Sequence, residues 1–483
     1  MQEKNKVNVI KAFVWKYFER FSYQIIQFVV QIILARILFP EDYGVISIIM
    51  VFISISNVFI QNGFNMSLVQ RKDVTDEDYS SVFTVGLILS VILYIIFYFA
   101  SPHIAQFYNM PVLTNTFRVV SITLILGSLN SVQCAYLVRY LKYKSLFLSN
   151  LVSAVISGSV SITLALCDFG VWALVIQQLL YSCLSTVILF FVIEWKPRLI
   201  LNFKRVKYLF SFGWKLLCSG LIEAIYNNVY ELIIGKKFNE TSLAYYSKGK
   251  QFPAIIVENI NSSVSSVMLT VLSKIQDEKE RMKELLKKSI VVSSTIMFPM
   301  MIGLLVVAKP LVSVLLTDKW LPCVPILQLL CISHSLMPIH TMNLQAINSL
   351  GRSDIYLKLE ILKKICALLI LLITIPFGIY AMVFGQIIIS LISSFINSYP
   401  NKKLLNYGFI EQMKDILPIA IVSIVMGIIV YLISYLNLGS LTILCIQCII
   451  GVLVYIALSS IFKLSGFVYL RGILKSKINK RKK

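Results

Sequence analysis

The sequence has few charged side chains for its length. Lys, Arg, Asp and Glu make up 14% of the 483 residues, hydrophobic residues make up 58%, and the mean hydropathy is +0.81. A water-soluble protein of this size needs far more polar surface. The scarcity of charge therefore argues against a soluble globular protein and favours a chain that lies within a membrane.

Motifs for metal, nucleotide and nucleophilic chemistry are also lacking. The three histidines, His103, His334 and His340, have no metal-site spacing, and the chain contains no GxxxxGK[ST] loop and no nucleophile elbow. The nine cysteines lie mostly in apolar runs, and the CxxC at Cys445 and Cys448 has no second pair. We therefore expect no cofactor, no metal site and no catalytic residue, and we do not expect an enzyme.

What the sequence does contain is a series of apolar runs of about 20 residues, each long enough to cross a bilayer core of ~30 Å as a helix. Backbone polar groups in lipid must be bonded within their own segment, so these runs are expected to be helices. We predict an all-α integral membrane protein with about fourteen spans, over residues 12–35, 43–62, 82–101, 113–135, 146–167, 170–193, 206–234, 241–271, 289–308, 322–347, 356–376, 378–400, 415–436 and 439–462.

The net charge of +22 could suggest nucleic-acid binding, but the distribution of the charges favours another reading. With a cytoplasmic N-terminus and fourteen spans, 32 of the Lys and Arg residues lie on the cytoplasmic side, counting Lys207 and Lys358 in the first turns of their spans. Only five fall in outer loops, namely Arg36, Lys236, Lys237, Lys309 and Lys319. This bias follows the positive-inside rule and predicts that both termini are cytoplasmic. The tail KSKINKRKK then reads as a topology anchor near anionic lipid, and no nucleic-acid partner is expected.

Two stretches of the chain are nearly the same. FGVWALVIQQ (Phe169–Gln178) and FGIYAMVFGQ (Phe377–Gln386) share five of ten residues at an offset of 208. Trp15 and Lys16 match Trp214 and Lys215 at an offset of 199, and Phe39 and Glu41 match Phe238 and Glu240 at the same offset. Matches in one order at nearly constant spacing indicate an internal duplication.

The duplication predicts the domain organisation. Residues 1–200 and 201–405 are expected to form two six-helix lobes, followed by an added helix pair over 406–465 and a basic cytoplasmic tail over 466–483. Because six is even, both lobes enter the membrane from the same side, and the repeat is parallel. Two such lobes are typical of a transporter that rocks around a central cavity, although a duplication can also build a larger inert scaffold.

A polar stripe runs along the first predicted span. Lys16, Arg20, Gln24, Gln27 and Gln31 fall within ~80° of one another on a helix. The seventh span repeats the arrangement with Lys215, Ser219, Glu223, Tyr226 and Tyr230, and the two stripes are expected to face each other. Polar side chains at membrane depth mark substrate or ion pathways. The eighth span adds Lys248, Lys250 and Glu258.

These residue types indicate a cargo with phosphate and sugar groups, because cations bind phosphate oxygens and amides, hydroxyls and tyrosine rings suit sugars. The predicted substrate-binding residues are Lys16, Arg20, Gln24, Gln27, Gln31, Lys215, Tyr226, Tyr230, Lys248 and Lys250. Ion-coupling candidates are Glu19, Glu223 and Glu258. Other readings stay open: Lys16 can extend to the interface, and Glu19 can neutralise Lys16 or Arg20. We expect Lys363 and Lys364 to pair with Glu360, and Ser273–Lys288 to form a solvated surface helix.

The WK pair, the run LARILFPEDYGVISI (Leu34–Ile48) and the FGVWALV and FGIYAMV pair resemble the Wzx-type polysaccharide flippases. These are the O-antigen and capsule repeat-unit transporters of the multidrug/oligosaccharidyl-lipid/polysaccharide superfamily. The resemblance implies movement of an undecaprenyl-pyrophosphate-linked oligosaccharide from the inner to the outer leaflet of a bacterial plasma membrane. It also implies ion coupling, a groove for the lipid tail at the last two helices, and other polysaccharide-assembly membrane proteins as partners.

Two alternatives are weighed against this reading. A drug or cation exporter of the same superfamily typically has twelve helices and an acidic cavity, whereas this sequence has an extra pair and a cationic stripe. A membrane glycan polymerase or ligase usually needs a sizeable outer loop, whereas the longest predicted outer loop, around Lys309–Leu321, is short.

Overall fold

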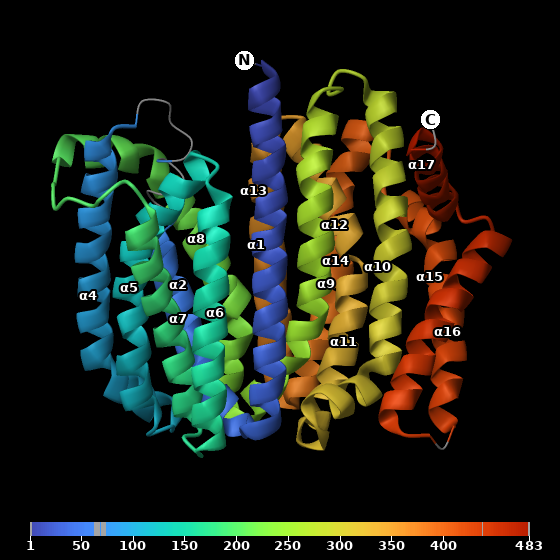
Figure 1. The fold of residues 1–483 in the computed structure, drawn as a ribbon. Helices are drawn as coiled ribbons and strands as arrows, with labels where there is room; N and C mark the ends of the chain where they lie inside the picture. The colour runs from blue at the N-terminus through green and yellow to red at the C-terminus, as the bar shows by residue number, and fades with distance from the viewer. Residues whose placement is uncertain (1, 62–67, 69–73, 437, 482–483) are drawn as a thin grey trace. The chain divides into compact units, whose positions relative to one another are not determined.

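A computed structural model describes residues 2–61, 68, 74–436 and 438–481. Within these ranges the backbone forms α-helices, short 3₁₀ helices and connecting turns, without a strand (Figure 1). The contacts divide the chain into two compact units, Met1–Ala244 and Tyr245–Lys483. The prediction of an all-α membrane protein is therefore confirmed.

Unit 1 contains seven described helices and the first residues of an eighth. They are α1 (Gln2–Ile37), α2 (Pro40–Gln61), α4 (Asp76–Tyr108), α5 (Leu113–Arg139), α6 (Tyr143–Leu166), α7 (Val171–Val192), α8 (Phe203–Lys237) and the start of α9 (Glu240–Ser273). Within this unit α1 packs on α6, α5 packs on α4 and α7, and α8 packs on α2 and α4.

Unit 2 continues α9 and adds the remaining helices of the chain. They are α10 (Lys279–Leu316), η1 (Asp318–Cys323), α11 (Val324–Ser335), α12 (Met337–Ser349), α13 (Ser353–Thr374), η2 (Ile375–Phe377), α14 (Ile379–Leu405), α15 (Phe409–Leu432), η3 (Ile433–Tyr435), α16 (Ser440–Ile461) and α17 (Ser465–Arg481). The central helix of this unit is α10, which packs on α11, α15 and α16.

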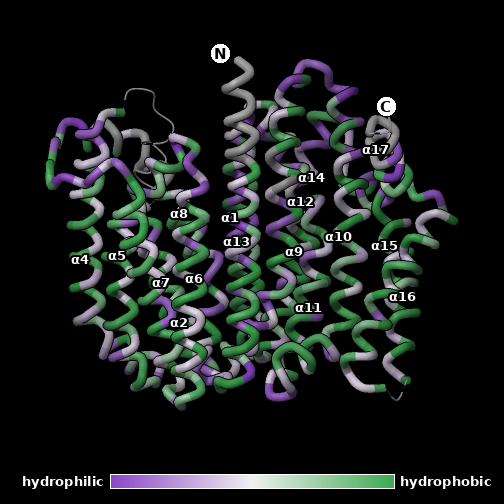
Figure 2. Tube along the Cα trace, viewed as in Figure 1, coloured by the Kyte–Doolittle hydropathy of each residue, from purple (hydrophilic) through white to green (hydrophobic). Residues whose placement is uncertain are grey.

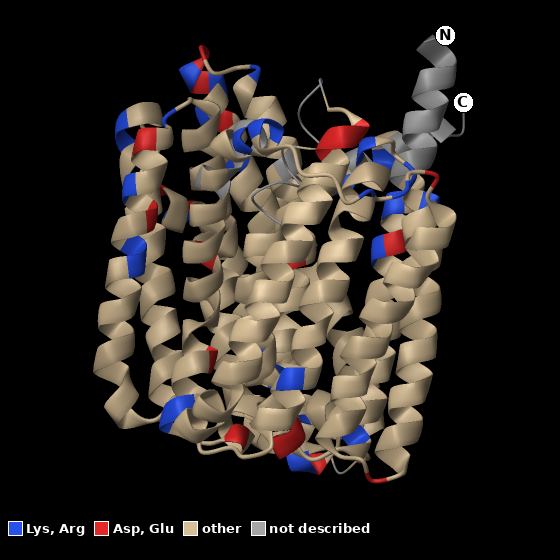
Figure 3. Ribbon diagram, turned by 90° about the vertical axis from the view of Figure 1, so that its left-hand side faces the viewer, with Lys and Arg blue, Asp and Glu red and all other residues tan. Residues whose placement is uncertain are grey.

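Eleven of the described helical segments are long and apolar enough to cross a membrane. The remaining three predicted spans, 12–35, 206–234 and 356–376, lie on α1, α8 and α13, which are long enough but carry more polar and charged residues. Figure 2 shows the hydrophobic colour along much of the described helices, and in Figure 3 the ribbon segments coloured as Lys, Arg, Asp and Glu lie mainly toward the helix ends. Every predicted span is therefore found on helix.

Two details of the predicted helices differ from the structure. The span over 322–347 is built from η1, α11 and α12, with a break at Leu336 and Pro338 in the first turn of α12. The expected surface helix over Ser273–Lys288 is wrong, because α9 ends at Ser273 and α10 begins at Lys279. Met282 and Leu286 are fully buried, so their spacing of four residues continues the apolar face of α10.

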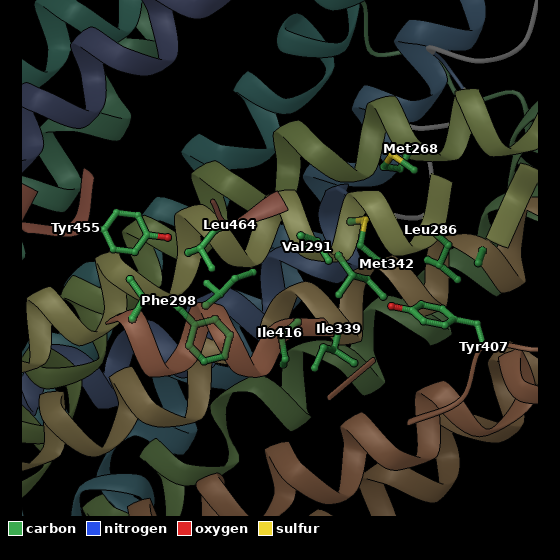
Figure 4. Packing of buried hydrophobic residues seen from close by; sticks show 14 of the residues in the cluster. Met268, Leu286, Val291, Phe298, Ile339, Met342, Tyr407, Ile416, Tyr455 and Leu464 are labelled. Atoms are coloured by element: carbon green, nitrogen blue, oxygen red, sulfur yellow. The ribbon is translucent and has the colours of Figure 1, made fainter. Parts of the chain in front are cut away.

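The interior of unit 2 is a continuous apolar cluster that draws on α9, α10, α12, α15 and α16 (Figure 4). Met268, Leu286 and Met342 pack near one end, and Phe298 and Tyr455 lie farther along. The Tyr455 hydroxyl donates to the Thr295 carbonyl oxygen at 2.7 Å and so ties α16 to α10. Lipid is as apolar as these side chains, so close packing and such polar contacts hold the helices together.

The segment that leads into α8 is anchored on α4. Trp195 packs in a buried cluster with Tyr79, and the side chain of Asn202 caps the start of α8 by accepting from the Arg205 backbone N–H. The Arg205 guanidinium in turn forms two hydrogen bonds with the fully buried carboxylate of Asp78, at 2.7 and 2.5 Å. This arrangement fixes the first turn of α8 against α4.

Candidate functional site

The polar stripe on α1 occupies a face that the packing of unit 1 leaves open. Lys16 and Arg20 are exposed, and Gln24, Gln27 and Gln31 are half-buried. A separate exposed stripe of Val14, Phe18, Phe21, Ile25 and Val29 lies on the opposite face. The helix therefore presents one apolar face suited to lipid and one polar face suited to a polar ligand or water.

A third face of α1 binds α6. Trp15 meets Phe147 with ring centroids 5.4 Å apart, and Val30 lies so close to Gly158 that a methyl group there would clash. The Lys16 ammonium lies 5.7 Å from the centre of the Tyr143 ring, a distance at which the ring attracts the cation. The contact holds Lys16 near α6 while leaving its charge exposed.

Glu19 has a partner that the sequence reading did not identify. The Asn150 amide donates to Glu19 Oε1 at 2.6 Å, and the Tyr181 hydroxyl donates to Asn150 Oδ1 at 3.2 Å. The Tyr181 ring also lies 5.5 Å from the ring of Tyr23. The carboxylate of α1 is thus connected through α6 to α7 by a chain of hydrogen bonds.

Tyr23 and Tyr181 also line a cavity of about 210 Å³ within unit 1. Its walls come from α1, α2, α5 and α7, and four amide side chains line it, Gln27, Asn57, Gln177 and Gln178. Hydroxyl groups line it at Tyr23, Thr123, Tyr181 and Ser182, and Met50, Ile53 and Gly127 complete the wall. Of the predicted substrate residues, Gln27 lies in this cavity.

Gln31 lies beside the cavity, where its amide nitrogen donates to Gln177 Oε1 at 3.5 Å. Gln177 and Gln178 end the duplicated segment FGVWALVIQQ, and Gln386 stands in the place of Gln178 in the second copy. The Gln386 amide also makes a polar contact, donating to the Tyr246 hydroxyl at 3.1 Å. The glutamines that end the two repeated segments thus mark polar positions inside the helices. The sequence analysis above uses these segments only to identify the duplication.

The stripe on α8 is described in part. The side chain of Lys215 lies outside the described residues, whereas Ser219 and Glu223 are exposed and Tyr226 and Tyr230 are half-buried. Between Tyr226 and Tyr230, the Asn228 amide donates to Ser54 Oγ at 3.3 Å and joins α8 to α2. Both predicted stripes therefore belong to unit 1.

The model of the polysaccharide biosynthesis protein family matches residues 33–325, which is more than half of the chain. The chain belongs to this family. It is 27% identical over 304 residues to the teichuronic acid biosynthesis protein TuaB of Bacillus subtilis, with 62% of each chain covered. It is 25% identical over 313 residues to the succinoglycan biosynthesis transport protein ExoT of Rhizobium meliloti, covering 65% of this chain and 63% of the relative.

The lipopolysaccharide biosynthesis protein WzxC of Escherichia coli is 21% identical over 337 residues, or 68% of each chain. The fold is similar to that of the lipid II flippase MurJ in an inward closed conformation, with a TM-score of 0.75 at 17% identity over 93% of this chain and 98% of that one. An inward-facing multidrug transporter of the MATE family has a TM-score of 0.61 at 15% identity, over 79% and 95%. The expected resemblance to Wzx-type polysaccharide biosynthesis proteins is confirmed.

The other predicted substrate-binding cations of this protein, Lys248 and Lys250, belong to unit 2. Lys248 is 5% exposed, with its ammonium 3.4 Å from Gln251 Oε1 and 5.8 Å from the centre of the Trp320 ring. Lys250 is half-buried and Glu258 is exposed. Lys363 forms the expected ion pair with Glu360 at 2.6 Å.

Unit 2 also contains a buried polar network that the sequence reading missed. His340 Nε2 lies 3.3 Å from the hydroxyls of Ser390 and Ser394, and the Asn397 amide nitrogen lies 3.4 Å from Nδ1. One helical turn away, Asn343 and Gln412 exchange two amide hydrogen bonds at 2.7 and 3.0 Å. The network joins α12, α14 and α15 near the break in the tenth predicted span.

Tyr407 lies in the connection between α14 and α15, outside the candidate membrane spans. The Tyr407 hydroxyl donates to Asp415 Oδ2 at 2.8 Å, and Lys287 pairs with Asp415 Oδ1 at 2.7 Å. Burial raises the pKa of Tyr407, and its hydrogen bond to the Asp415 carboxylate raises it further. Tyr407 therefore stays protonated, as its donating role requires.

Proposed function

We propose that this protein is a flippase that moves undecaprenyl-pyrophosphate-linked oligosaccharide repeat units from the inner to the outer leaflet of a bacterial plasma membrane by alternating access. The observation that carries the proposal is the open polar face of α1, which is cationic at Lys16 and Arg20 and leads to an uncharged, amide-lined cavity. Membership of the polysaccharide biosynthesis family supports it.

The physical problem explains why such a helix is useful. The polyprenyl tail of the cargo prefers lipid, whereas each sugar hydroxyl that enters hydrocarbon without a partner costs several kcal/mol. A head group with many hydroxyls therefore crosses an undisturbed bilayer at a negligible rate. A helix with one apolar and one polar face can offer partners to the head group while its other side remains in contact with lipid.

Each polar residue is given a role in this proposal. Lys16, Arg20 and Lys215 hold the pyrophosphate by charge-assisted hydrogen bonds. Sugar groups contact the remaining polar side chains of the two stripes, namely Gln24, Gln27, Gln31, Tyr226 and Tyr230. In unit 2, Lys248 and Lys250 are proposed to contact substrate in a different state of the transport cycle, because Lys248 is enclosed in the described one.

We further propose that transport is ion-coupled through Glu19, Glu223 and Glu258. Glu223 and Glu258 are exposed, so a proton or cation can reach them without rearrangement of the neighbouring side chains. The Asn150 amide donates to the Glu19 carboxylate, and a bound ion can replace Asn150 as the partner of that carboxylate. An ion drives transport only when its affinity differs between the two states of the carrier.

The duplication gives the proposed domain organisation, with lobes at 1–200 and 201–405, a helix pair over 406–465 and a basic tail over 466–483. α15 and α16 form the added pair, which packs on α10, and α16 keeps a largely exposed apolar surface that suits a polyprenyl tail. Both termini are proposed to be cytoplasmic. Other polysaccharide-assembly membrane proteins are proposed as partners.

The test is a leaflet assay in cells that lack the gene for this chain. We expect lipid-linked repeat units to accumulate in the inner leaflet and to reach the outer leaflet when the gene is restored. A glycan polymerase or ligase predicts instead that single repeat units reach the outer leaflet without the chain and are not joined there. A drug exporter predicts normal repeat-unit distribution and altered drug sensitivity.

A further inference from the structure

The cavity in unit 1 has a composition that suits only some ligands. Among the described residues that line it, none carries a charge at neutral pH. Most of them have amide or hydroxyl side chains, and the remainder form a small apolar part of the wall. Its volume of about 210 Å³ is far above the ~10–15 Å³ that one water needs, and below the ~300–1,000 Å³ of pockets for larger ligands. A single polar ring is the size of ligand that fits.

In the wall of this cavity, the side-chain amide nitrogen of Gln177 lacks a hydrogen-bond partner. The residue is 2% exposed, its Oε1 accepts from Gln31, and its Nε2 is buried without a hydrogen-bond partner. Leaving a buried polar group unpaired costs ~1–3 kcal/mol, so such a group is normally satisfied by a water or a ligand. A hydroxyl both donates and accepts, so it can pair with this amide in either orientation.

Hydrogen bonds connect the wall of the cavity to a negative charge. Tyr181 lines the cavity and donates its hydroxyl proton to Asn150, which itself donates to the carboxylate of Glu19. An anionic ligand in the cavity would lose its hydration and gain no cationic partner from the described lining. It would also lie next to a series of hydrogen bonds that ends at the Glu19 carboxylate. A neutral ligand avoids these costs.

We propose that this cavity is a subsite for one uncharged sugar ring of the lipid-linked head group, and that Gln177 is its specificity-determining residue. The subsite rests on the proposed function, because the head group supplies the ring. Gln177 donates to a ring oxygen or hydroxyl, Gln27 and Asn57 bind other hydroxyls, and the rings of Tyr23 and Tyr181 form an apolar wall for the sugar C–H groups.

The full chain in lipid nanodiscs provides a test that does not depend on transport. Saturation-transfer-difference NMR is recorded with methyl glucopyranoside, with methyl N-acetylglucosaminide and with methyl glucuronide, which is anionic at neutral pH. We expect signals from at least one neutral probe and none above the empty-nanodisc blank from the anionic probe. Gln177→Met should weaken the neutral probe roughly three- to tenfold, which is the effect of one neutral hydrogen bond.

Two matched pairs of variants separate the subsite from effects on folding. Gln133 is equally buried with an unpaired Oε1 but does not line the cavity, so Gln133→Met should leave probe binding unchanged. Gly127 has only Asn57 near the position of an added Cβ, so Gly127→Val projects into the cavity and should abolish binding. Gly303→Val, at a helix position with open surroundings, is its control.

The subsite is overturned if Gln177→Met and Gly127→Val bind the neutral probes as the unchanged chain does, since the cavity then holds water only. It is also overturned if the glucuronide binds as well as the neutral probes. The leaflet assay distinguishes this failure from failure of the proposed function. Normal flipping in Gly127→Val cells refutes the subsite alone, whereas probe binding without any flipping by the unchanged chain refutes the function alone.

Discussion

At the scale of single residues, Arg20 is the most informative position in the proposed substrate site. Its side chain is exposed on the polar face of α1, about one helical turn from Tyr23 in the cavity wall. Charged hydrogen bonds contribute ~1.5–3 kcal/mol, and ~1.4 kcal/mol is a factor of ten. Arg20→Ala should therefore reduce export at least about tenfold, with the protein still present in the membrane, and lipid-linked repeat units should accumulate in the inner leaflet.

Arg20→Lys should keep part of the export, because the charge remains but the two-pronged geometry of the guanidinium is lost. Arg281→Ala is the control, since Arg281 is exposed and pairs only locally with Glu278 at 3.2 Å. Surface polysaccharide and leaflet distribution are measured for each variant. If the double variant Arg20→Ala with Lys215→Ala keeps wild-type polysaccharide levels, the polar stripe does not bind substrate and its role is structural.

His340 allows a prediction that involves no function. The Ser390 hydroxyl donates to the Ser333 carbonyl oxygen at 2.7 Å, and the Ser394 hydroxyl donates to the Ser390 carbonyl oxygen at 2.9 Å. Both hydroxyl protons are then committed, so Nε2 must be the donor toward these oxygens, and Nδ1 accepts from Asn397. We expect the neutral ring to be the Nε2–H tautomer.

Nitrogen-15 NMR of labelled histidine tests this prediction, with His103 and His334 replaced by Gln so that one histidine remains. A protonated Nε2 and a lone-pair-bearing Nδ1 have well-separated shifts. The opposite assignment would show that one of the serine hydroxyls has turned toward the ring. Replacing Asn397 with Leu should change the Nδ1 shift and leave Nε2 nearly unchanged.

How far the sequence predicts single residues depends on whether their partners are local. The stripe on α1 follows from helical periodicity alone, so the sequence predicts Gln27 and Gln31 without reference to their surroundings. Asn150 and Tyr181 were not predicted, because they contribute only after α6 and α7 pack beside α1. The same holds for His340 and Asn397, whose helices approach each other only in the folded unit.

At the scale of elements, the start of α8 is held by an ion pair whose stability can be measured. Asp78 is fully buried, and Arg205 is the cation that forms two hydrogen bonds with it. Arg205→Ala leaves a buried carboxylate without this partner and should destabilise the protein by about 2–4 kcal/mol, somewhat below the ~3–5 kcal/mol of a fully buried pair because Arg205 is half-exposed.

Thermal unfolding of the purified protein, followed by helical circular dichroism, provides the measurement. Adding Asp78→Asn to Arg205→Ala should recover part of the loss, since an amide costs less to bury than a carboxylate. The control is Arg352→Ala, which breaks the exposed pair with Asp354 at 2.9 Å and should change little. Equal destabilisation by Arg205→Ala and Arg352→Ala would contradict this account.

Element boundaries were the hardest feature to predict. Hydropathy placed every predicted span on helix, but α4 and α10 extend far beyond their apolar runs, to 33 and 38 residues. Charged residues such as those near Lys279 continue a helix as readily as they begin a separate one, and composition does not distinguish the two cases. The break at Leu336 had a local signal in Pro338, which cannot supply a backbone hydrogen bond in mid-helix.

At the scale of the whole molecule, the proposed coupling to an ion gradient predicts how export responds to that gradient. Glu19, Glu223 and Glu258 are the proposed carriers of the ion. We expect export in sealed vesicles to fall when the proton and sodium gradients are collapsed, and Glu223→Gln to reduce the remaining gradient dependence. Undiminished export without gradients would remove any role for coupling and leave the flippase proposal intact.

The last prediction concerns how the chain is threaded through the membrane. The bias of 32 Lys and Arg residues to five across the predicted segments places Asn239 outside the cell and Asp277 in the cytoplasm. Both residues are exposed, so a cysteine placed at either is accessible from its own side. The nine native cysteines are free and must first be replaced. In intact cells, a membrane-impermeant maleimide should label Asn239→Cys and should label Asp277→Cys only after the membrane is opened. The two positions are joined by one helix, α9, so labelling of both in intact cells would mean that α9 does not cross the membrane, and reversed labelling would invert the whole topology.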